Sequence, residues 1–152
     1  MKVLIDGDCC NKLDTITQIC QKKEIPVLLF CDWTRWIDSD YVEVHTVDKG
    51  RDSADFALLN YVVPGDVVVT QDAGLASMAL AKKAYVIHNR GIQFTKYNIN
   101  TFLNKRFLRE RTTRKTGRYC KGLNLEKQPN YCFGHEFYKL VNYAQKQAQM
   151  NT

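Results

Sequence analysis

The chain has 152 residues, of which 45% are hydrophobic and 25% are charged, as in an ordinary globular protein. This length favours a single domain over residues 1–152, and no apolar run approaches the roughly 20 residues that a membrane-spanning helix needs. The N-terminus lacks the pattern of a signal peptide, and the six cysteines lack the paired C-x-x-C spacing of zinc sites. We therefore expect a cytoplasmic protein with reduced thiols and no membrane segment.

Short apolar segments alternate with helical ones along the chain. Strands are predicted at Val3–Asp6, Pro26–Cys31, Val42–Val47, Val67–Thr70 and Ala84–His88. Apolar residues spaced three and four apart predict helices at Leu13–Lys22, Ala54–Val62 and Leu75–Lys82, and two more are expected at about Asn98–Arg111 and Gly134–Gln149. The pattern predicts an α/β fold with a mostly parallel central sheet of about five strands and helices on both faces.

Positive charge is concentrated towards the C-terminal part. The net charge is +6, and residues 104–121 alone contain eight Lys or Arg and one Glu. Such a cluster attracts polyanions and favours RNA as a partner, although a solvated helix face followed by a loop at about 112–133 would look the same. The candidate nucleic-acid-binding residues are Lys105, Arg106, Arg109, Arg111, Arg114, Lys115 and Arg118.

Acidic residues follow most of the predicted strands. Asp6 and Asp8 come after the first strand, Asp32 after the second, Asp48 after the third and Asp72 after the fourth. The carboxyl ends of parallel strands share one edge of the sheet, where ligands bind at the point at which the strand order reverses. The helix after the third strand opens on the same edge with Asp52 and Asp55. These residues also suit turns and helix caps, so a purely structural role remains an alternative.

A cluster of carboxylates is costly without a cation. Two carboxylates about 4 Å apart repel by roughly 4 kcal/mol at an effective dielectric of 20. A divalent ion removes this cost, and oxygen ligands favour Mg²⁺ or Mn²⁺. The candidate metal ligands are Asp6, Asp8, Asp52, Asp55 and Asp72, and all but Asp52 are also candidate catalytic residues. Ser53 and Thr70 could support the site as hydrogen-bond donors.

Four stretches occur in the order seen in a known family. "VLIDGDCC", "GRDSADFALL", "PGDVVVTQDAGLASMAL" and "GIQFTKYNI" resemble the YaiI/YqxD family of uncharacterised bacterial proteins over roughly residues 2–118. That family is placed among the PIN-like domains, so the resemblance implies a three-layer α/β/α PIN-like sandwich. Many PIN relatives are Mg²⁺- or Mn²⁺-dependent ribonucleases.

The resemblance also assigns residues. It implies that Asp6, Asp72 and either Asp52 or Asp55 are the clustered acids, and that Asp8 belongs to a D-x-D signature. The segment that starts at Arg90 resembles the family's "RG…(Y/F)T…NI" stretch, which makes Arg90 a candidate supporting residue. One departure is Cys-Cys-Asn after Asp8, where the family usually has Ala-Cys-Pro.

Together these features predict a metal-dependent nuclease that hydrolyses RNA phosphodiesters. Trp33, Trp36 and Tyr119 could stack on unpaired bases. The alternatives are a non-catalytic RNA- or partner-binding module and, less favoured, a haloacid-dehalogenase-type phosphatase with Asp6 as nucleophile and Asp8 as acid and base. The oligomeric state is left open, a dimer included.

Overall fold

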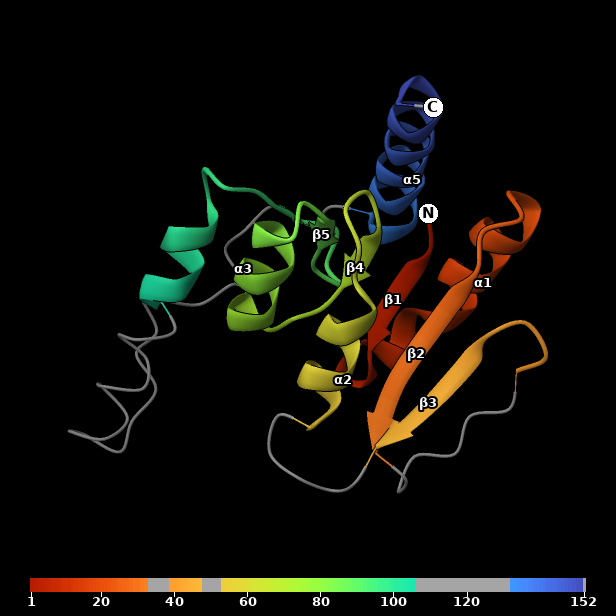
Figure 1. Ribbon diagram of the computed structural model, residues 1–152, viewed down its shortest axis with the longest axis horizontal. Coiled ribbons are helices and arrows are strands. Elements are labelled where there is room, and N and C mark those ends of the chain that lie inside the picture. Colours follow the sequence, from red (N-terminus) through yellow and green to blue (C-terminus); the bar gives the residue numbers. More distant parts are fainter. Residues whose placement is uncertain (33–38, 48–52, 106–131, 152) are drawn as a thin grey trace.

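The computed structural model describes residues 1–32, 39–47, 53–105 and 132–151. Within these residues the strands form one six-stranded sheet with the order β3-β2-β1-β4-β5-β6 (Figure 1). The strands are β1 (Val3–Asp6), β2 (Val27–Asp32), β3 (Glu43–Val47), β4 (Val67–Val69), β5 (Tyr85–Ile87) and β6 (Gln93–Phe94). Strands β1 to β5 run parallel, and β6 pairs antiparallel with β5. The predicted α/β fold with a mostly parallel sheet is confirmed.

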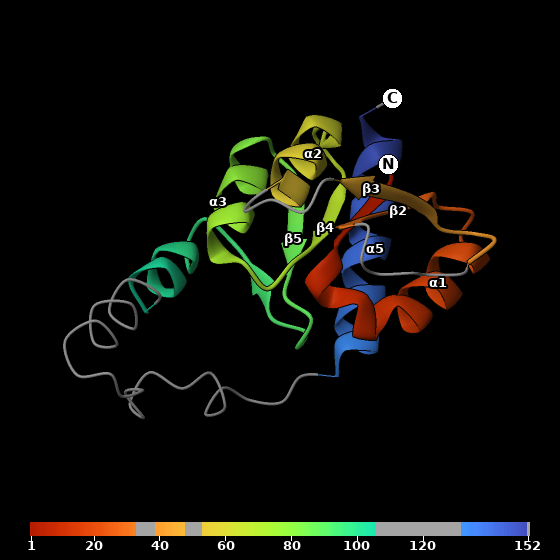
Figure 2. The same ribbon diagram turned by 90° about the horizontal axis from the view of Figure 1, so that it is seen from below.

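Helices cover both faces of this sheet. They are the 3₁₀ segment η1 (Gly7–Lys12), α1 (Leu13–Lys22), α2 (Ser53–Tyr61), α3 (Ala73–Ala81), a helix over residues 99–105, and α5 (Phe133–Met150). Helices α1 and α5 pack on one face, whereas α2 and α3 pack on the other (Figures 1 and 2). The structure is therefore a three-layer α/β/α sandwich. No helix in the described residues is long and apolar enough to cross a membrane.

Alternation along the strands creates two hydrophobic cores. In β1, Val3 and Ile5 pack with α1 and α5, whereas Leu4 packs with α2 and α3. Successive side chains of a strand point to opposite faces, so a strand that is buried on both faces must be apolar at nearly every position. This is why β1, β2 and β4 are continuous apolar runs in the sequence.

The predicted elements agree closely with the structure where it describes them. Helix α1 has the predicted bounds, and α5 begins and ends one residue outside its predicted range. Strand β6 was not predicted, because two residues are too few to form a pattern. The helix expected at Asn98–Arg111 is confirmed over residues 99–105, and the rest of it, together with nearly all of the 112–133 loop, lies outside the described residues.

A buried ion pair closes the amino-terminal end of the sheet. The Asp66 side chain is 1% exposed and accepts hydrogen bonds from the backbone N–H of Lys2 (3.1 Å), from Lys2 Nζ (2.6 Å) and from the backbone N–H of Val63 (3.0 Å). These contacts fasten the start of β1 to the turn before β4. Burial of this carboxylate is tolerated because a lysine from the same chain neutralises it.

At the opposite end of β1, Gly7 lies against β2. A Cβ at Gly7 would lie 2.9 Å from the carbonyl oxygen of Phe30 and 3.0 Å from Cys31 Cβ. Neither neighbour is the tip of a flexible side chain, so the strands would have to move apart. Only glycine allows this approach.

Gly7→Ala should therefore destabilise the fold, by about 1–3 kcal/mol as is typical of overpacking. The matched control is Gly134→Ala in α5, where the new Cβ would meet only Thr15 Cγ2 at 3.3 Å and helix propensity improves. Urea denaturation of both variants measures the difference. Equal stability of Gly7→Ala and the wild type would contradict the tight contact.

Candidate functional site

The strand order reverses between β1 and β4. From β1 the chain passes through α1 to β2 on one side, and from β3 it returns through α2 to β4 on the other side of β1. Crossovers in opposite directions leave a crevice at the carboxyl ends of the two central strands, which is where open α/β sheets bind ligands. Asp6 is the last residue of β1, and Thr70 directly follows β4.

A chain of hydrogen bonds connects the two strand ends. The Thr70 hydroxyl donates to Asp6 Oδ2 (3.0 Å) and accepts from the backbone N–H of Asp72 (3.0 Å). Because an amide N–H can only donate, the hydroxyl proton is directed to Asp6. Asp72 in turn caps α3, since its Oδ1 accepts from the backbone N–H of Gly74 (2.8 Å) and Leu75 (3.3 Å). Thr70 thus fixes the Asp6 carboxylate relative to the start of α3.

The charges of two neighbouring carboxylates act on Asp6 at this edge. Asp6 is 6% exposed, and its burial raises the pKa of the carboxyl group. Hydrogen bonds from Thr70 and from the backbone N–H of Asp8 oppose this rise, whereas the charges of Asp8 and Asp72 add to it. Both charges that act on Asp6 within the described residues are therefore negative. We call Asp6, Asp8 and Asp72 the acid edge.

The chemistry of the acid edge suits a hard divalent cation. Its donors are carboxylate oxygens, and a cation would offset the cost of burying Asp6 beside two like charges. The described residues nevertheless contain no group of three or more Asp, Glu, His or Cys side chains arranged to hold a metal ion. One oxygen of Asp72 already caps α3, so Asp6 and Asp8 stay the main candidate ligands in the described part of the chain.

The other predicted site residues have more varied positions. Asp55 lies in the first turn of α2, half-buried, and is not among the charges that act on Asp6. Ser53 is the first residue of α2, and Arg90 is exposed in the turn between β5 and β6. Lys105 lies in the 99–105 helix with Nζ 5.7 Å from the centre of the Phe102 ring.

Several predicted residues lie outside the described part of the chain, and their roles stay predictions. They are Asp48, Asp52, Trp33, Trp36, Tyr119 and the basic residues Arg106, Arg109, Arg111, Arg114, Lys115 and Arg118.

His88 is a neighbour of the site that the sequence did not indicate. Ile5, Val69 and Ile87 are aligned across β1, β4 and β5, so the next residues, Asp6, Thr70 and His88, occupy one row at the carboxyl edge. His88 Nδ1 accepts the backbone N–H of Arg90 (3.0 Å), which places the proton of the neutral ring on Nε2. Burial, together with the charge of Arg90, lowers the pKa of His88 to about 4. The ring is therefore neutral at physiological pH.

Asn89, the next residue along the chain after His88, is also a buried polar residue. Its side chain is 6% exposed, and within the described part of the chain its Oδ1 is buried without a hydrogen-bond partner. Their location in the sequence could have indicated them, because His88 and Asn89 come after an apolar run, as Asp6 and Asp72 do.

The chain belongs to the YaiI/YqxD family. The family model described as "Uncharacterized BCR, YaiI/YqxD family" matches residues 4–143, so the match continues past residue 118, where the resemblance was expected to end. A "UPF0178 protein" of Natranaerobius thermophilus is 41% identical over 121 residues, which cover 80% of this chain and 82% of that protein. Another of Alkaliphilus oremlandii is 43% identical, over 80% of this chain and 78% of that protein. No solved structure matches the chain.

Asp6→Asn should raise the melting temperature in chelator-treated buffer at neutral pH. The substitution removes a buried charge that faces Asp8 and Asp72, and the amide oxygen can still accept from Thr70 and from the Asp8 N–H. This gain in melting temperature over the wild type should shrink as the pH falls towards 3.8. The pKa of Asp6 is higher in the folded wild type than in the unfolded chain, so protonation of Asp6 stabilises the folded wild type in this range.

The matched control for this variant is Asp66→Asn. It breaks the buried pair with Lys2 and should cost about 1–3 kcal/mol, allowing for the partial exposure of Lys2. Thermal melts of both variants from pH 4 to 8 make the comparison. If Asp6→Asn destabilises the metal-free protein as Asp66→Asn does, the acid edge is a structural feature.

The contribution of His88 to stability should depend on pH in the opposite direction to that of Asp6. The folded pKa of His88, about 4, lies below the ordinary 6.5, so the unfolded chain binds the additional proton and stability is lost as the pH falls from 6.5 to 4. The full loss is about 3 kcal/mol. His88→Asn, whose Oδ1 can accept the Arg90 N–H in place of Nδ1, should remove most of this slope in pH-dependent urea denaturation. An unchanged slope would show that His88 is not buried in the neutral form.

Proposed function

We propose that the protein is a Mg²⁺- or Mn²⁺-dependent ribonuclease that hydrolyses RNA phosphodiesters at the acid edge. The observation that carries this proposal is the burial of Asp6 beside Asp8 and Asp72 at the switch point of the sheet. An ionised carboxylate in such a place destabilises the fold unless a cation joins it or the group takes up a proton. The Lys2–Asp66 pair shows how the same chain neutralises a buried acid that has only a structural role.

The roles of the residues follow from their contacts. Asp6 and Asp8 would hold the ion, and either Asp55 in the first turn of α2 or Asp52, which precedes that helix in the sequence, would complete its ligands. Thr70 fixes the orientation of Asp6 through a hydrogen bond. Asp72 donates its backbone N–H to Thr70 and caps α3, so it connects the Thr70–Asp6 pair to the amino end of that helix. When bound, such an ion lowers the pKa of a coordinated water and offsets the charge of a phosphate.

RNA is favoured as the substrate by the rest of the chain. Residues 104–121 carry eight Lys or Arg and one Glu, a density of charge that attracts a phosphate backbone. Membership of the YaiI/YqxD family supports the same proposal only through the resemblance of that family to PIN-like domains.

The geometry disfavours the phosphatase alternative. There Asp6 would have to attack phosphorus, yet its side chain is 6% exposed and its Oδ2 accepts the Thr70 hydroxyl. A carboxylate held in this way is better suited to bind a cation than to act as a nucleophile.

The test is cleavage of a labelled single-stranded RNA in Mn²⁺ or Mg²⁺. Asp6→Asn and Asp72→Asn should each lower the cleavage rate by on the order of 100-fold or more, because each removes a charge at the site of chemistry. Asparagine at position 72 can still cap α3, so the second variant should fold normally. Asp14→Asn, at an exposed acid in the first turn of α1, is the control and should cut like the wild type.

Two results would overturn the proposal. One is cleavage by Asp6→Asn at the wild-type rate, which would trace the activity to another site or to a contaminant. The other is tight RNA binding by the wild type with no cleavage in either metal, which would identify a binding module.

A further inference from the structure

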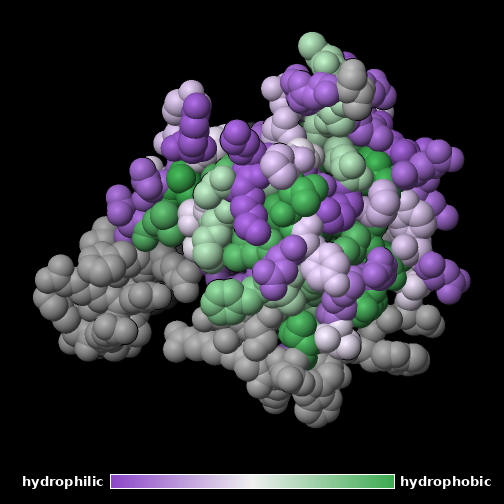
Figure 3. All heavy atoms as spheres, in the orientation of Figure 1, coloured by the Kyte–Doolittle hydropathy of each residue, from purple (hydrophilic) through white to green (hydrophobic). Residues whose placement is uncertain are grey.

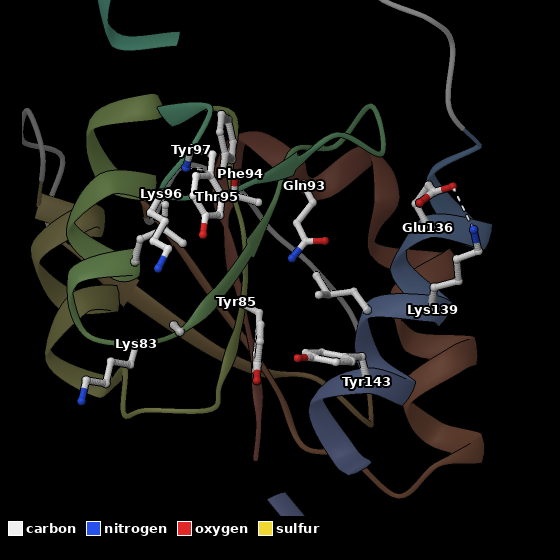
Figure 4. A pocket seen from close by; sticks show the side chains of 13 residues that line it. Lys83, Tyr85, Gln93, Phe94, Thr95, Lys96, Tyr97, Glu136, Lys139 and Tyr143 are labelled. Atoms are coloured by element: carbon white, nitrogen blue, oxygen red, sulfur yellow. Dashed lines mark hydrogen bonds and ion pairs between the residues drawn. The ribbon is translucent and has the colours of Figure 1, made fainter. Parts of the chain in front are cut away.

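A groove of about 790 Å³ lies on the molecule away from the acid edge (Figure 4). It runs between the β5–β6 edge of the sheet, the end of α3, and α5. The face of the molecule that Figure 3 shows carries both hydrophilic and hydrophobic side chains. The polar and aromatic lining of the groove includes Lys83, Tyr85, Lys96, Tyr97, Lys139 and Tyr143.

The charge of the groove is positive. Three lysines line it, and Glu136 is the one acid among the lining residues, all of which belong to the described part of the chain. The Glu136 carboxylate lies 3.8 Å from Lys139 Nζ, so its charge is already offset. Lys83 and Lys96 leave a net positive field that favours an anionic ligand.

Aromatic rings are unusually accessible here. Tyr97 is 85% exposed and Tyr143 is 53% exposed, and the Tyr143 ring meets Tyr85 edge-on with centroids 5.6 Å apart. Lys96 Nζ lies 5.2 Å from the centre of the Tyr97 ring. Open ring faces beside lysines are the combination that binds single-stranded nucleic acid, because bases stack on the rings while phosphates meet the cations.

The edge of β6 is closed to a pairing strand. Phe94 pairs with Val86 of β5, so the neighbouring backbone groups of Gln93 and Thr95 face outwards. The Asn98 side chain hydrogen-bonds to both residues. Its Nδ2 donates to the Gln93 carbonyl (2.9 Å), and its Oδ1 accepts from the Thr95 N–H (2.8 Å). An extended peptide therefore cannot add to the sheet here without displacing Asn98.

We propose that this groove is an anchoring site for single-stranded RNA, with bases stacked on Tyr97 and Tyr143 and phosphates bound by Lys83 and Lys96. The inference deepens the proposed ribonuclease function by adding a contact for its substrate. An acidic peptide matches the charge, but it makes no use of exposed ring faces and finds the backbone of the β6 edge already occupied.

The anchor is separate from the acid edge. Tyr85 is aligned through Val67 with Val3, three residues before Asp6 and two strands away. At about 3.3 Å per residue and 4.8 Å per strand, the backbone positions of Tyr85 and Asp6 are roughly 14 Å apart. An RNA strand held in the groove would therefore have to extend beyond it to reach the acid edge. Binding at the groove can thus be measured separately from cleavage.

The test is fluorescence anisotropy of a labelled single-stranded RNA with the Asp6→Asn protein in chelator, so that nothing is cut. Tyr143→Ala should weaken binding by about tenfold through the loss of one stacked base. The control is Tyr138→Ala on the same helix, where a similarly exposed tyrosine lies outside the groove and should change the affinity less than twofold.

Two lysine substitutions, one in the groove and one outside it, test the contribution of charge to RNA binding. Lys96→Gln should reduce the slope of log K against log salt by about 0.7, the value for one phosphate contact on a single strand. Lys22→Gln, an exposed lysine at the end of α1, removes the same charge and should leave the slope unchanged. Melting curves of all four variants verify that each is folded.

Equal binding by the groove variants and their controls would overturn the anchor. So would binding of a poly-glutamate peptide that displaces the RNA and is insensitive to Tyr143→Ala. The anchor and the nuclease fail separately: if the wild type never cleaves but Tyr143→Ala still weakens binding, only the nuclease proposal falls. If cleavage in Mn²⁺ is normal and Tyr143→Ala leaves KM unchanged, only the anchor falls.

Discussion

The burial of one carboxylate, Asp6, is the constraint to which the site is adapted. β1 is the central strand on which the order of the sheet reverses, and it ends on a charge that water reaches only slightly. Thr70 and the Asp8 backbone satisfy its oxygens, but hydrogen bonds do not remove the repulsion from Asp8 and Asp72. Asp66 gives the comparison within the same sheet: it is buried more completely, yet Lys2 neutralises it. The chain itself neutralises Asp66, whereas the charges that act on Asp6 within the described residues, those of Asp8 and Asp72, are negative.

Much of this architecture could be predicted from the sequence, because the strands are buried on both faces. β1 and β4 must be continuous apolar runs, and such runs between helical patterns indicate a parallel sheet. The convergence of Asp6 and Asp72 then followed from a general property of parallel sheets, without knowledge of the strand order. Elements that make few contacts were harder to predict. β6 is two residues long, and its stability depends on Asn98, five residues beyond its start.

The details of the site were less predictable, because they depend on burial and on side-chain direction. The sequence does not show the pKa of a histidine at the end of a strand, and it is burial together with the charge of Arg90 that lowers the pKa of His88 to about 4. Asp55 has the spacing of both a helix cap and a metal ligand, and its distance from Asp6 depends on how α2 begins. Thr70 was a candidate donor by residue type alone, whereas its actual partner is set by the register of β1 against β4.

The groove beside β6 and the acid edge carry opposite charge, which has a consequence for any polyanion. The lysines of the groove beside β6 attract phosphate, whereas the negative charges of Asp6, Asp8 and Asp72 repel it. A divalent ion at the acids would reverse this repulsion and leave the groove unchanged. On the proposed function, binding at the anchor is therefore independent of metal, whereas approach to the acids requires it. The metal then has two roles, since it admits the phosphate to the site as well as supporting the chemistry there.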